Sequence, residues 1–182
     1  MPIKQLQYIV YASLLAALTA VGAFIPIPIG PVPIILQNLF VLLAGLLLGS
    51  RWGFTSMAVY LLVGAVGMPV FTGGKGGIAH FMGPTGGYLI GFAVCAFVTG
   101  WIAERSSGRT GWDIAAVIAG SLLVYACGVP WLKAVTAMTW TKAVMVGMLP
   151  FLMGDAIKAV MAVMLARAVR PMLQRQLQTV SA

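Results

Sequence analysis

Six apolar runs of about 13 to 20 residues fill most of this chain and decide what it can fold into. Hydrophobic residues make up 61% of its 182 residues and charged residues only 8%, whereas an ordinary soluble domain is about 25% charged. So few polar side chains cannot cover the surface of a soluble domain, and a disordered chain would lack the apolar residues. The chain is therefore predicted to be a polytopic membrane protein.

We predict an all-α membrane protein with six transmembrane helices that form a single integral-membrane domain over residues 1–182. Six crossings of about 20 residues use about 120 residues, which leaves too few for a separate soluble domain. The predicted spans cover residues 8–25, 34–48, 54–66, 88–103, 114–132 and 150–169. The last span is expected to begin with Pro150 in its first turn, where proline is favoured; the alternative is a longer helix that kinks there.

Two segments between the predicted spans cannot be regular helix. Residues 25–33 hold four prolines, which remove backbone donors and impose extended geometry. Residues 67–87 hold eight glycines, which indicate a loop. Because irregular backbone within a membrane is tolerated only against protein or a water-filled cavity, the two segments are candidates to cover a site together.

The lysines and arginines are divided unevenly between the two sides of this six-span arrangement. Cytoplasmic loops carry the excess of basic residues, so both termini are predicted to be cytoplasmic and both irregular segments to face outward. The net charge of +8 then reflects topology, and no nucleic-acid partner is expected. The terminal side has Lys4, Arg51, Arg105, Arg109, Arg167, Arg170 and Arg175, and the other side has Lys75, Lys133 and Lys142.

Asp155 and Lys158 fall inside the last predicted span. Each would cost about 2.5–3.5 kcal/mol at mid-span, and their three-residue spacing places them on one face of a helix, where they can neutralise each other. One interpretation is an ion pair that only fixes packing. The other, which we favour, is a polar ligand site facing the bundle interior, because ionisable residues within membranes usually serve function.

Further candidate ligand contacts flank the irregular segments. Gln37 and Asn38 open the second span directly after the proline run; Gln37 either caps that broken backbone or hydrogen-bonds a ligand. The glycine-rich segment and its end hold Phe71, Lys75, His80, Thr85 and Tyr88. Glycines allow close backbone approach to a ligand and aromatic rings supply flat apolar walls, although a plain outer loop is the alternative.

The sequence offers little for catalysis or metal binding. His80 is its only histidine, and its acids number three, so no metal site or acid–base pair can be assembled. Cys95 and Cys127 lie within apolar runs, as small buried side chains do. Lys75 is followed by Gly76 rather than Ser or Thr, so it does not complete a nucleotide-binding phosphate loop. We expect no enzyme activity and no cofactor.

Small residues recur at four-residue spacing in the first span, at Ala12, Ala16 and Ala20. Such a ridge lets helices approach closely in lipid. It serves either packing within the chain or docking of a partner membrane protein, and the sequence does not separate these two roles.

Segments along nearly the whole chain, in order, resemble the BioY family, the biotin-specific S components of energy-coupling-factor (ECF) vitamin transporters. The segments that carry this resemblance are Val32-Pro33-Ile34-Ile35-Leu36-Gln37, Leu43-Ala44-Gly45, Leu48-Gly49, Arg51-Trp52-Gly53, Tyr60, Gly67-Met68-Pro69-Val70-Phe71, Gly83-Pro84-Thr85-Gly86-Gly87-Tyr88-Leu89, Pro150-Phe151, Gly154-Asp155 and Lys158.

The resemblance implies a six-helix S-component fold in the bacterial inner (plasma) membrane. It also implies a site for biotin, the transported ligand, under the loops after the first and third spans. The implied ligand contacts are Asp155, Lys158, Gln37, Phe71, Lys75, Thr85 and Tyr88. The implied protein partners are a T component, which would dock on Ala12, Ala16 and Ala20, and two ATP-binding subunits; uptake by the chain alone or as a homo-oligomer stays open.

Two other functions fit the same residues. The first is an S component for another vitamin, such as thiamin or riboflavin. The second is a small ion-coupled carrier or channel that uses Asp155 as a relay. A carrier of that kind would need polar residues along several spans, and the first, fourth and fifth spans offer almost none.

Overall fold

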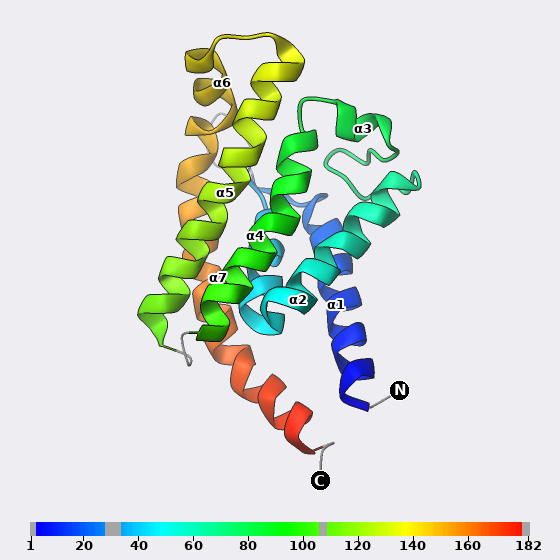
Figure 1. The fold of residues 1–182 in the computed structure, drawn as a ribbon, viewed down its shortest axis with the longest axis vertical. Helices are drawn as coiled ribbons and strands as arrows, with labels where there is room; N and C mark the ends of the chain where they lie inside the picture. The colour runs from blue at the N-terminus through cyan, green and yellow to red at the C-terminus, as the bar shows by residue number, and fades with distance from the viewer. Residues whose placement is uncertain (1–2, 28–33, 106–108, 180–182) are drawn as a thin grey trace.

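The computed structural model describes residues 3–27, 34–105 and 109–179, and these form a bundle of long helices (Figure 1). The start of the first helix and the end of the last lie at one end of the bundle, which we call the terminal end. Helices α3 and α6 lie at the opposite end. The elements are α1 (Ile3–Gly22), β1 (Pro26–Ile27), β2 (Ile34–Ile35), α2 (Gln37–Ala65), α3 (Ala79–Met82), α4 (Gly86–Arg105), α5 (Thr110–Thr136), α6 (Trp140–Gly147) and α7 (Leu149–Thr179).

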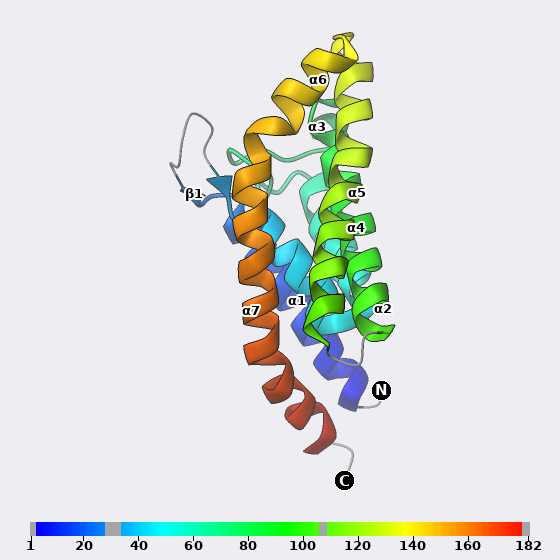
Figure 2. The same cartoon turned by 90° about the vertical axis from the view of Figure 1, so that its left-hand side faces the viewer.

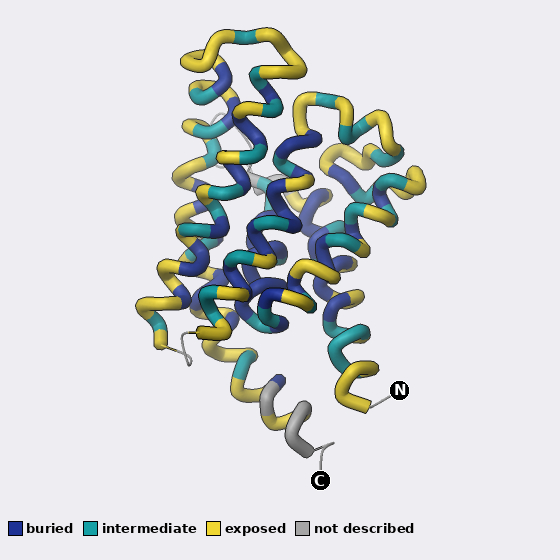
Figure 3. The backbone as a smooth tube through the Cα atoms, viewed as in Figure 1, coloured by how far each residue is buried: buried dark blue, intermediate teal, exposed yellow. Residues whose placement is uncertain are grey.

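Five helices of the described chain, α1, α2, α4, α5 and α7, are long and apolar enough to cross a membrane. Their outward faces carry large apolar side chains, such as Leu62, Val160 and Met164, each at least 60% exposed. Figure 3 shows buried residues along the inner faces of the helices and exposed residues on the outside. A surface this apolar suits a lipid environment, so the prediction of a helical membrane protein is confirmed, with five such helices rather than six.

The difference in helix number arises in α2, which contains two of the predicted spans and folds back on itself at Gly49. The backbone of Gly49 leaves the helical region, with φ 79° and ψ −173°. Gln37 Nε2 donates to Tyr60 Oη at 2.5 Å, although 23 residues of straight helix would separate them by about 35 Å. The two arms of α2 therefore run antiparallel (Figure 1). The turn expected after the second span is present, and it lies within α2 at Gly49.

Glu104, the next-to-last residue of α4, stabilises this turn. Its two carboxylate oxygens accept hydrogen bonds from the Ser50 backbone N–H at 2.8 Å and the Ser50 hydroxyl at 2.9 Å. A carboxylate beside the first N–H groups of a helix satisfies donors that have no intrahelical partner. A Cβ at Gly49 would overlap the same carboxylate.

Replacing Gly49 by alanine is expected to destabilise the protein by about 1–3 kcal/mol or more. A side chain at φ 79° is strained, and the new methyl group would displace Glu104 from Ser50. The midpoint of thermal unfolding in detergent measures the effect. Gly111→Ala, at a helical position where a Cβ meets nothing within 4 Å, is the control and should unfold at or above the wild-type temperature. Equal unfolding temperatures for Gly49→Ala and wild type would contradict this account.

A buried ion pair joins three helices near the terminal end. The Arg170 guanidinium of α7 donates to both carboxylate oxygens of Asp113 in α5 at 3.0 Å, and also to the Leu46 carbonyl of α2 at 3.1 Å. The side chain of Asp113 is wholly buried. Two parallel charge-assisted hydrogen bonds fix direction as well as distance, so this pair sets how α7 lies against α5 and α2.

The irregular segments lie at the end opposite the termini. Strand β1 pairs antiparallel with β2, with Pro26 opposite Ile35; residues 28–33, where most of the expected extended run falls, lie outside the described residues. Residues 67–85 form the expected loop, which also contains the short helix α3. Gly77 N–H donates to the Gly64 carbonyl at 2.7 Å and so ties this loop back to the end of α2.

The break between the last two helices falls at Met148. Helix α6 ends at Gly147 and α7 begins at Leu149, which puts Pro150 in the first turn of α7, as the sequence predicts. Figure 2 shows α6 leading at an angle into α7, with β1 beside the upper part of α7. The first turns of α7 are thereby placed next to the irregular segments.

Candidate functional site

A cavity of about 420 Å³ lies among the first arm of α2, the loop, and helices α4, α5, α6 and α7. That volume is within the range of small-molecule sites. Its lining residues are Ile35, Gln37, Asn38, Thr72, Pro84, Thr85, Tyr88, Phe92, Val124, Tyr125, Leu132, Val146, Gly147, Phe151, Asp155 and Lys158. Most of them are apolar or aromatic, and the charged ones are Asp155 and Lys158.

Asp155 and Lys158 sit one helical turn apart on the face of α7 that lines the cavity. Lys158 Nζ lies 2.5 Å from Asp155 Oδ1 and also donates to the Ile35 carbonyl at 3.1 Å. The Tyr125 hydroxyl donates to the other carboxylate oxygen. Each carboxylate oxygen accepts more than one hydrogen bond, so Asp155 keeps acceptor capacity while its charge is balanced.

Gln37 and Asn38 contribute amides from the first turn of α2. Gln37 Oε1 accepts a hydrogen bond from the Thr72 hydroxyl of the loop at 3.2 Å, and Tyr60, its other partner, donates to the Val70 carbonyl at 3.1 Å. Gln37 therefore ties α2 to the loop and lines the cavity as well. Asn38 Oδ1 is buried without a hydrogen-bond partner among the described residues, a state that costs about 1–3 kcal/mol.

Thr85, at the end of the loop, and Tyr88, in the first turn of α4, line the cavity. The Tyr88 hydroxyl donates to the Gly147 carbonyl at 2.8 Å and so connects α4 with α6. Thr85 Oγ1 lies 3.1 Å from His80 Nε2. The Tyr88 side chain is thus tied to α6 and the Thr85 side chain to the loop.

Phe71 and Lys75 do not line the cavity, which corrects the expectation that Phe71 walls it. The Phe71 side chain is 0% exposed and stacks on His80, with 5.2 Å between ring centroids. It fills space left by the absent side chain of Gly64, so the ring anchors the loop to α2. The aromatic walls are instead Tyr88, Phe92 and Phe151, while Lys75 is exposed on the loop.

The small-residue ridge of α1 faces the interior of the bundle, which corrects the expectation that its alanines dock a partner. Ala12 and Ala16 are buried and belong to the core cluster. The Ser56 hydroxyl donates to the Ala12 carbonyl at 2.7 Å, so α1 and the second arm of α2 pack closely here. Ala20 is half-buried. Of the two roles left open by the sequence, packing within the chain is the one that the structure supports.

Sequence reasoning missed several residues of the cavity. Tyr125 lies inside an apolar run, and only the packing of α5 against α7 brings it to Asp155. Thr72 lies between Phe71 and two glycines and shows no pattern of its own. Phe151 carries the one available signal, because it follows Pro150 at the expected start of the last span.

His80 holds a hydrogen bond and a ring contact at the edge of the loop. Partial burial, and secondarily the positive charge of Lys75, lower the pKa of His80 below its ordinary value. The lowered pKa favours the neutral imidazole near pH 7.

Thermal stability is expected to fall as the pH is lowered from 7 towards 5, partly because of His80. In the unfolded chain His80 is protonated at its ordinary pKa, whereas in the folded state its pKa is lower. The unfolded state therefore binds more protons, and it is favoured increasingly as the pH drops. Unfolding midpoints measured across this range should fall less steeply for His80→Gln. Parallel pH profiles for wild type and variant would rule out this contribution.

The chain is similar in sequence to known transporters over most of its length. The sequence model of the BioY family matches residues 1–175. A probable biotin transporter BioY from Pyrococcus horikoshii is 45% identical over 154 residues, which cover 85% of this chain and 90% of the relative. The biotin transporter BioY of Thermotoga maritima is 43% identical over 161 residues, covering 88% of this chain and 94% of the relative.

A solved structure shares the fold over almost the whole chain. It is described as the crystal structure of the S-component for biotin from an ECF-type ABC transporter. The two chains are 32% identical, with a TM-score of 0.84 and 94% of each chain covered.

Proposed function

The chain belongs to the BioY family, and from that premise we propose that its cavity binds biotin and that the chain is the biotin-binding subunit of an uptake system. The single observation that carries this proposal is a cavity of about 420 Å³ in which one charged pair meets mostly apolar and aromatic walls. A ligand that fits must combine a compact polar group with an apolar body. The relatives are named as transporters, which agrees with the expectation that the chain is not an enzyme.

The polar end of the cavity complements the ureido ring of biotin. That ring offers two N–H donors and one carbonyl acceptor. Asp155 accepts from one N–H, and Lys158, which is paired with Asp155, donates to the carbonyl. Asn38 Oδ1, which has no partner among the described residues, accepts from the second N–H. A buried acceptor without a hydrogen bond is unfavourable, so a ligand that donates to it gains binding free energy.

The rest of the ligand meets the apolar part of the cavity. Tyr88, Phe92 and Phe151 pack against the thioether ring and the alkyl chain. Thr85 donates to the biotin carboxylate at the loop side of the cavity. Lys75 is exposed on the loop and does not line the cavity. It therefore reaches that carboxylate only if the loop rearranges. Gln37 and Phe71 act indirectly, by holding the loop against α2.

Titration of the purified chain with biotin by calorimetry tests the proposal. We expect saturable binding of one biotin per chain. A thermal-shift panel with biotin, thiamin and riboflavin tests the ligand class, and only biotin should raise the unfolding temperature. Stabilisation by riboflavin or thiamin without biotin would assign the chain to another vitamin instead.

The chain supplies the binding step of uptake, and its partners supply the energy. It has no nucleotide-binding motif, and the solved structure to which it is similar is described as part of an ECF-type ABC transporter. The proposed partners are therefore a T component and two ATP-binding subunits, with uptake alone or as a homo-oligomer as the alternative mode. Docking on α1 would use its exposed face, which includes Leu14. Uptake assays with and without the ATPase module distinguish the two modes.

We further propose six membrane crossings, with both termini in the cytoplasm of a bacterial cell. The hairpin at Gly49 supports this count, because two antiparallel arms can cross a membrane as separate segments. The excess of lysine and arginine at the terminal end supports the orientation. In a chain with Cys95 and Cys127 replaced by alanine, an impermeant maleimide added to intact cells should label Lys142→Cys and leave Arg51→Cys unlabelled. The reverse pattern would invert the topology.

A further inference from the structure

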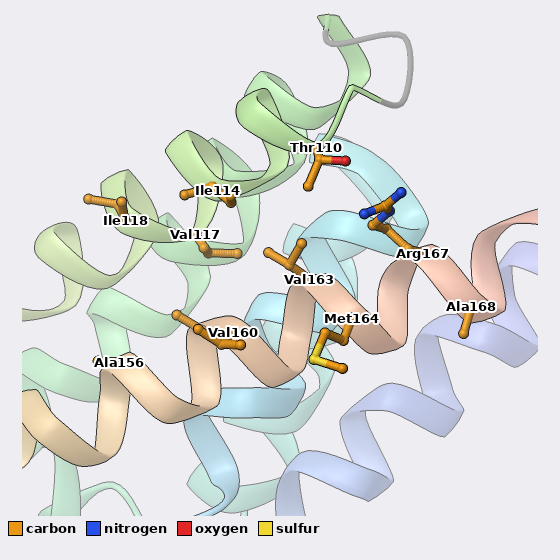
Figure 4. A pocket seen from close by; sticks show the side chains of 11 residues that line it. Thr110, Ile114, Val117, Ile118, Ala156, Val160, Val163, Met164, Arg167 and Ala168 are labelled. Carbon is orange, nitrogen blue, oxygen red and sulfur yellow. The ribbon is translucent and has the colours of Figure 1, made fainter.

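A second, larger hollow separates α5 from α7 in the half of the bundle nearer the terminal end (Figure 4). Its volume is about 790 Å³, and it shares no lining residue with the candidate biotin cavity. We call it the α5–α7 groove. Its lining residues are Thr110, Ile114, Val117, Ile118, Ala156, Ala159, Val160, Val163, Met164, Arg167 and Ala168.

The α5–α7 groove is apolar along its length and open on one side. Val117 and Val163 form its floor, at 2% and 6% exposed, whereas Val160 and Met164 on the rim are 60% and 66% exposed. The groove extends from Ala156 to Ala168 along α7, which is about 18 Å of helix. One leaflet contributes about 15 Å of the hydrocarbon core, so the groove matches the depth of a single leaflet.

Polar groups occur at one end of the groove only. Arg167 and Thr110 lie together at the terminal end (Figure 4). Arg167 is exposed, and its guanidinium makes no hydrogen bond or ion pair with the described residues. Acids do not compensate it, because all three have other partners: Asp113 holds Arg170, Asp155 holds Lys158, and Glu104 accepts from Ser50.

We propose that the α5–α7 groove binds one acyl chain of an anionic phospholipid, with the lipid phosphate on Arg167 and Thr110. An unpaired guanidinium presents a planar set of donors that suits a phosphate group, and basic pockets between membrane helices at the cytoplasmic surface bind anionic head groups. The apolar floor and rim provide the surface for the chain. Since α7 also carries Asp155 and Lys158, this one helix contacts lipid on one face and the biotin cavity on the other.

Native mass spectrometry of the purified chain tests the proposal. The protein is equilibrated with equal amounts of phosphatidylglycerol and phosphatidylcholine that carry the same acyl chains. We expect one phosphatidylglycerol to be retained preferentially by wild type. Arg167→Gln should weaken its retention about tenfold or more, because a charge-assisted hydrogen bond is lost, and Arg167→Lys should restore part of it. Arg51→Gln, an exposed cation outside the groove, should behave as wild type.

A second pair of variants tests the acyl-chain part of the site. Val160→Phe fills the groove and should displace the lipid, whereas Met161→Phe, on a neighbouring part of α7 outside the groove, should not. Biotin binding by each variant shows that it is folded and reports on the other cavity. Equal retention of the two lipids would overturn the proposal. It would also be overturned if inorganic phosphate alone bound as well as the lipid does, or if Val160→Phe lost self-association of the chain instead of bound lipid.

Discussion

Replacing Asp155 by asparagine is expected to weaken biotin binding 100-fold or more. The substitution keeps the size of the side chain but removes the charge that pairs with Lys158 and that we propose accepts from the ligand. Breaking a buried ion pair by removing one partner costs about 3–5 kcal/mol because the remaining charge is uncompensated. Part of that cost is expected to appear as weaker biotin binding. Calorimetric titration of the purified variant measures the dissociation constant directly.

Glu104→Gln is the matched control for Asp155→Asn. It also removes one carboxylate charge, but Glu104 binds Ser50 at the far end of α4 and does not line the cavity. Its biotin affinity should equal that of wild type, although its stability falls. If Asp155→Asn binds biotin as tightly as Glu104→Gln does, Asp155 is not a ligand contact and the proposed binding geometry is wrong.

Replacing Arg170 by leucine is expected to cost about 3–5 kcal/mol of stability. The variant leaves the Asp113 carboxylate, which is fully buried, without its bidentate partner, and it frees the Leu46 carbonyl. Unfolding by a denaturing detergent, followed by tryptophan fluorescence, measures the loss.

The double variant Asp113→Leu/Arg170→Leu separates charge burial from packing. Replacing both members of a buried pair by apolar residues is often neutral or stabilising, so the double variant should recover most of the stability lost by Arg170→Leu. A double variant as unstable as the single one would show that the leucine side chains, rather than an unpaired carboxylate, cause the loss.

Features encoded within short stretches of sequence were predictable. The apolar runs give the membrane helices, Pro150 gives the start of α7, and the spacing of Asp155 and Lys158 gives their common face, because each depends only on residues close together in sequence. Glycines and prolines likewise mark the loop, since they act on the local backbone.

Features that depend on contacts between distant segments were not predictable. Phe71 is buried because Gly64 and Tyr60 leave a space for its ring, and no local pattern reveals that space. Tyr125 reaches Asp155 across 30 residues of chain. The alanine ridge of α1 has the same sequence pattern whether it packs within the chain or against a partner. Only the position of α1 against α2 shows that it packs within the chain.

The attachment of Arg170 has a mechanical consequence for ligand binding. Helix α7 runs from Leu149 through Arg170 without an internal proline after its first turn, so this part is one continuous rod, attached near one end to Asp113 and the Leu46 carbonyl. Lys158 lies about 18 Å along the rod from Arg170. A tilt of only about 3° about that point shifts its ammonium group by about 1 Å, and displacements of this size disrupt positioned contacts. We therefore expect the angle of α7 to affect ligand binding at the proposed site, which lies far from its point of attachment.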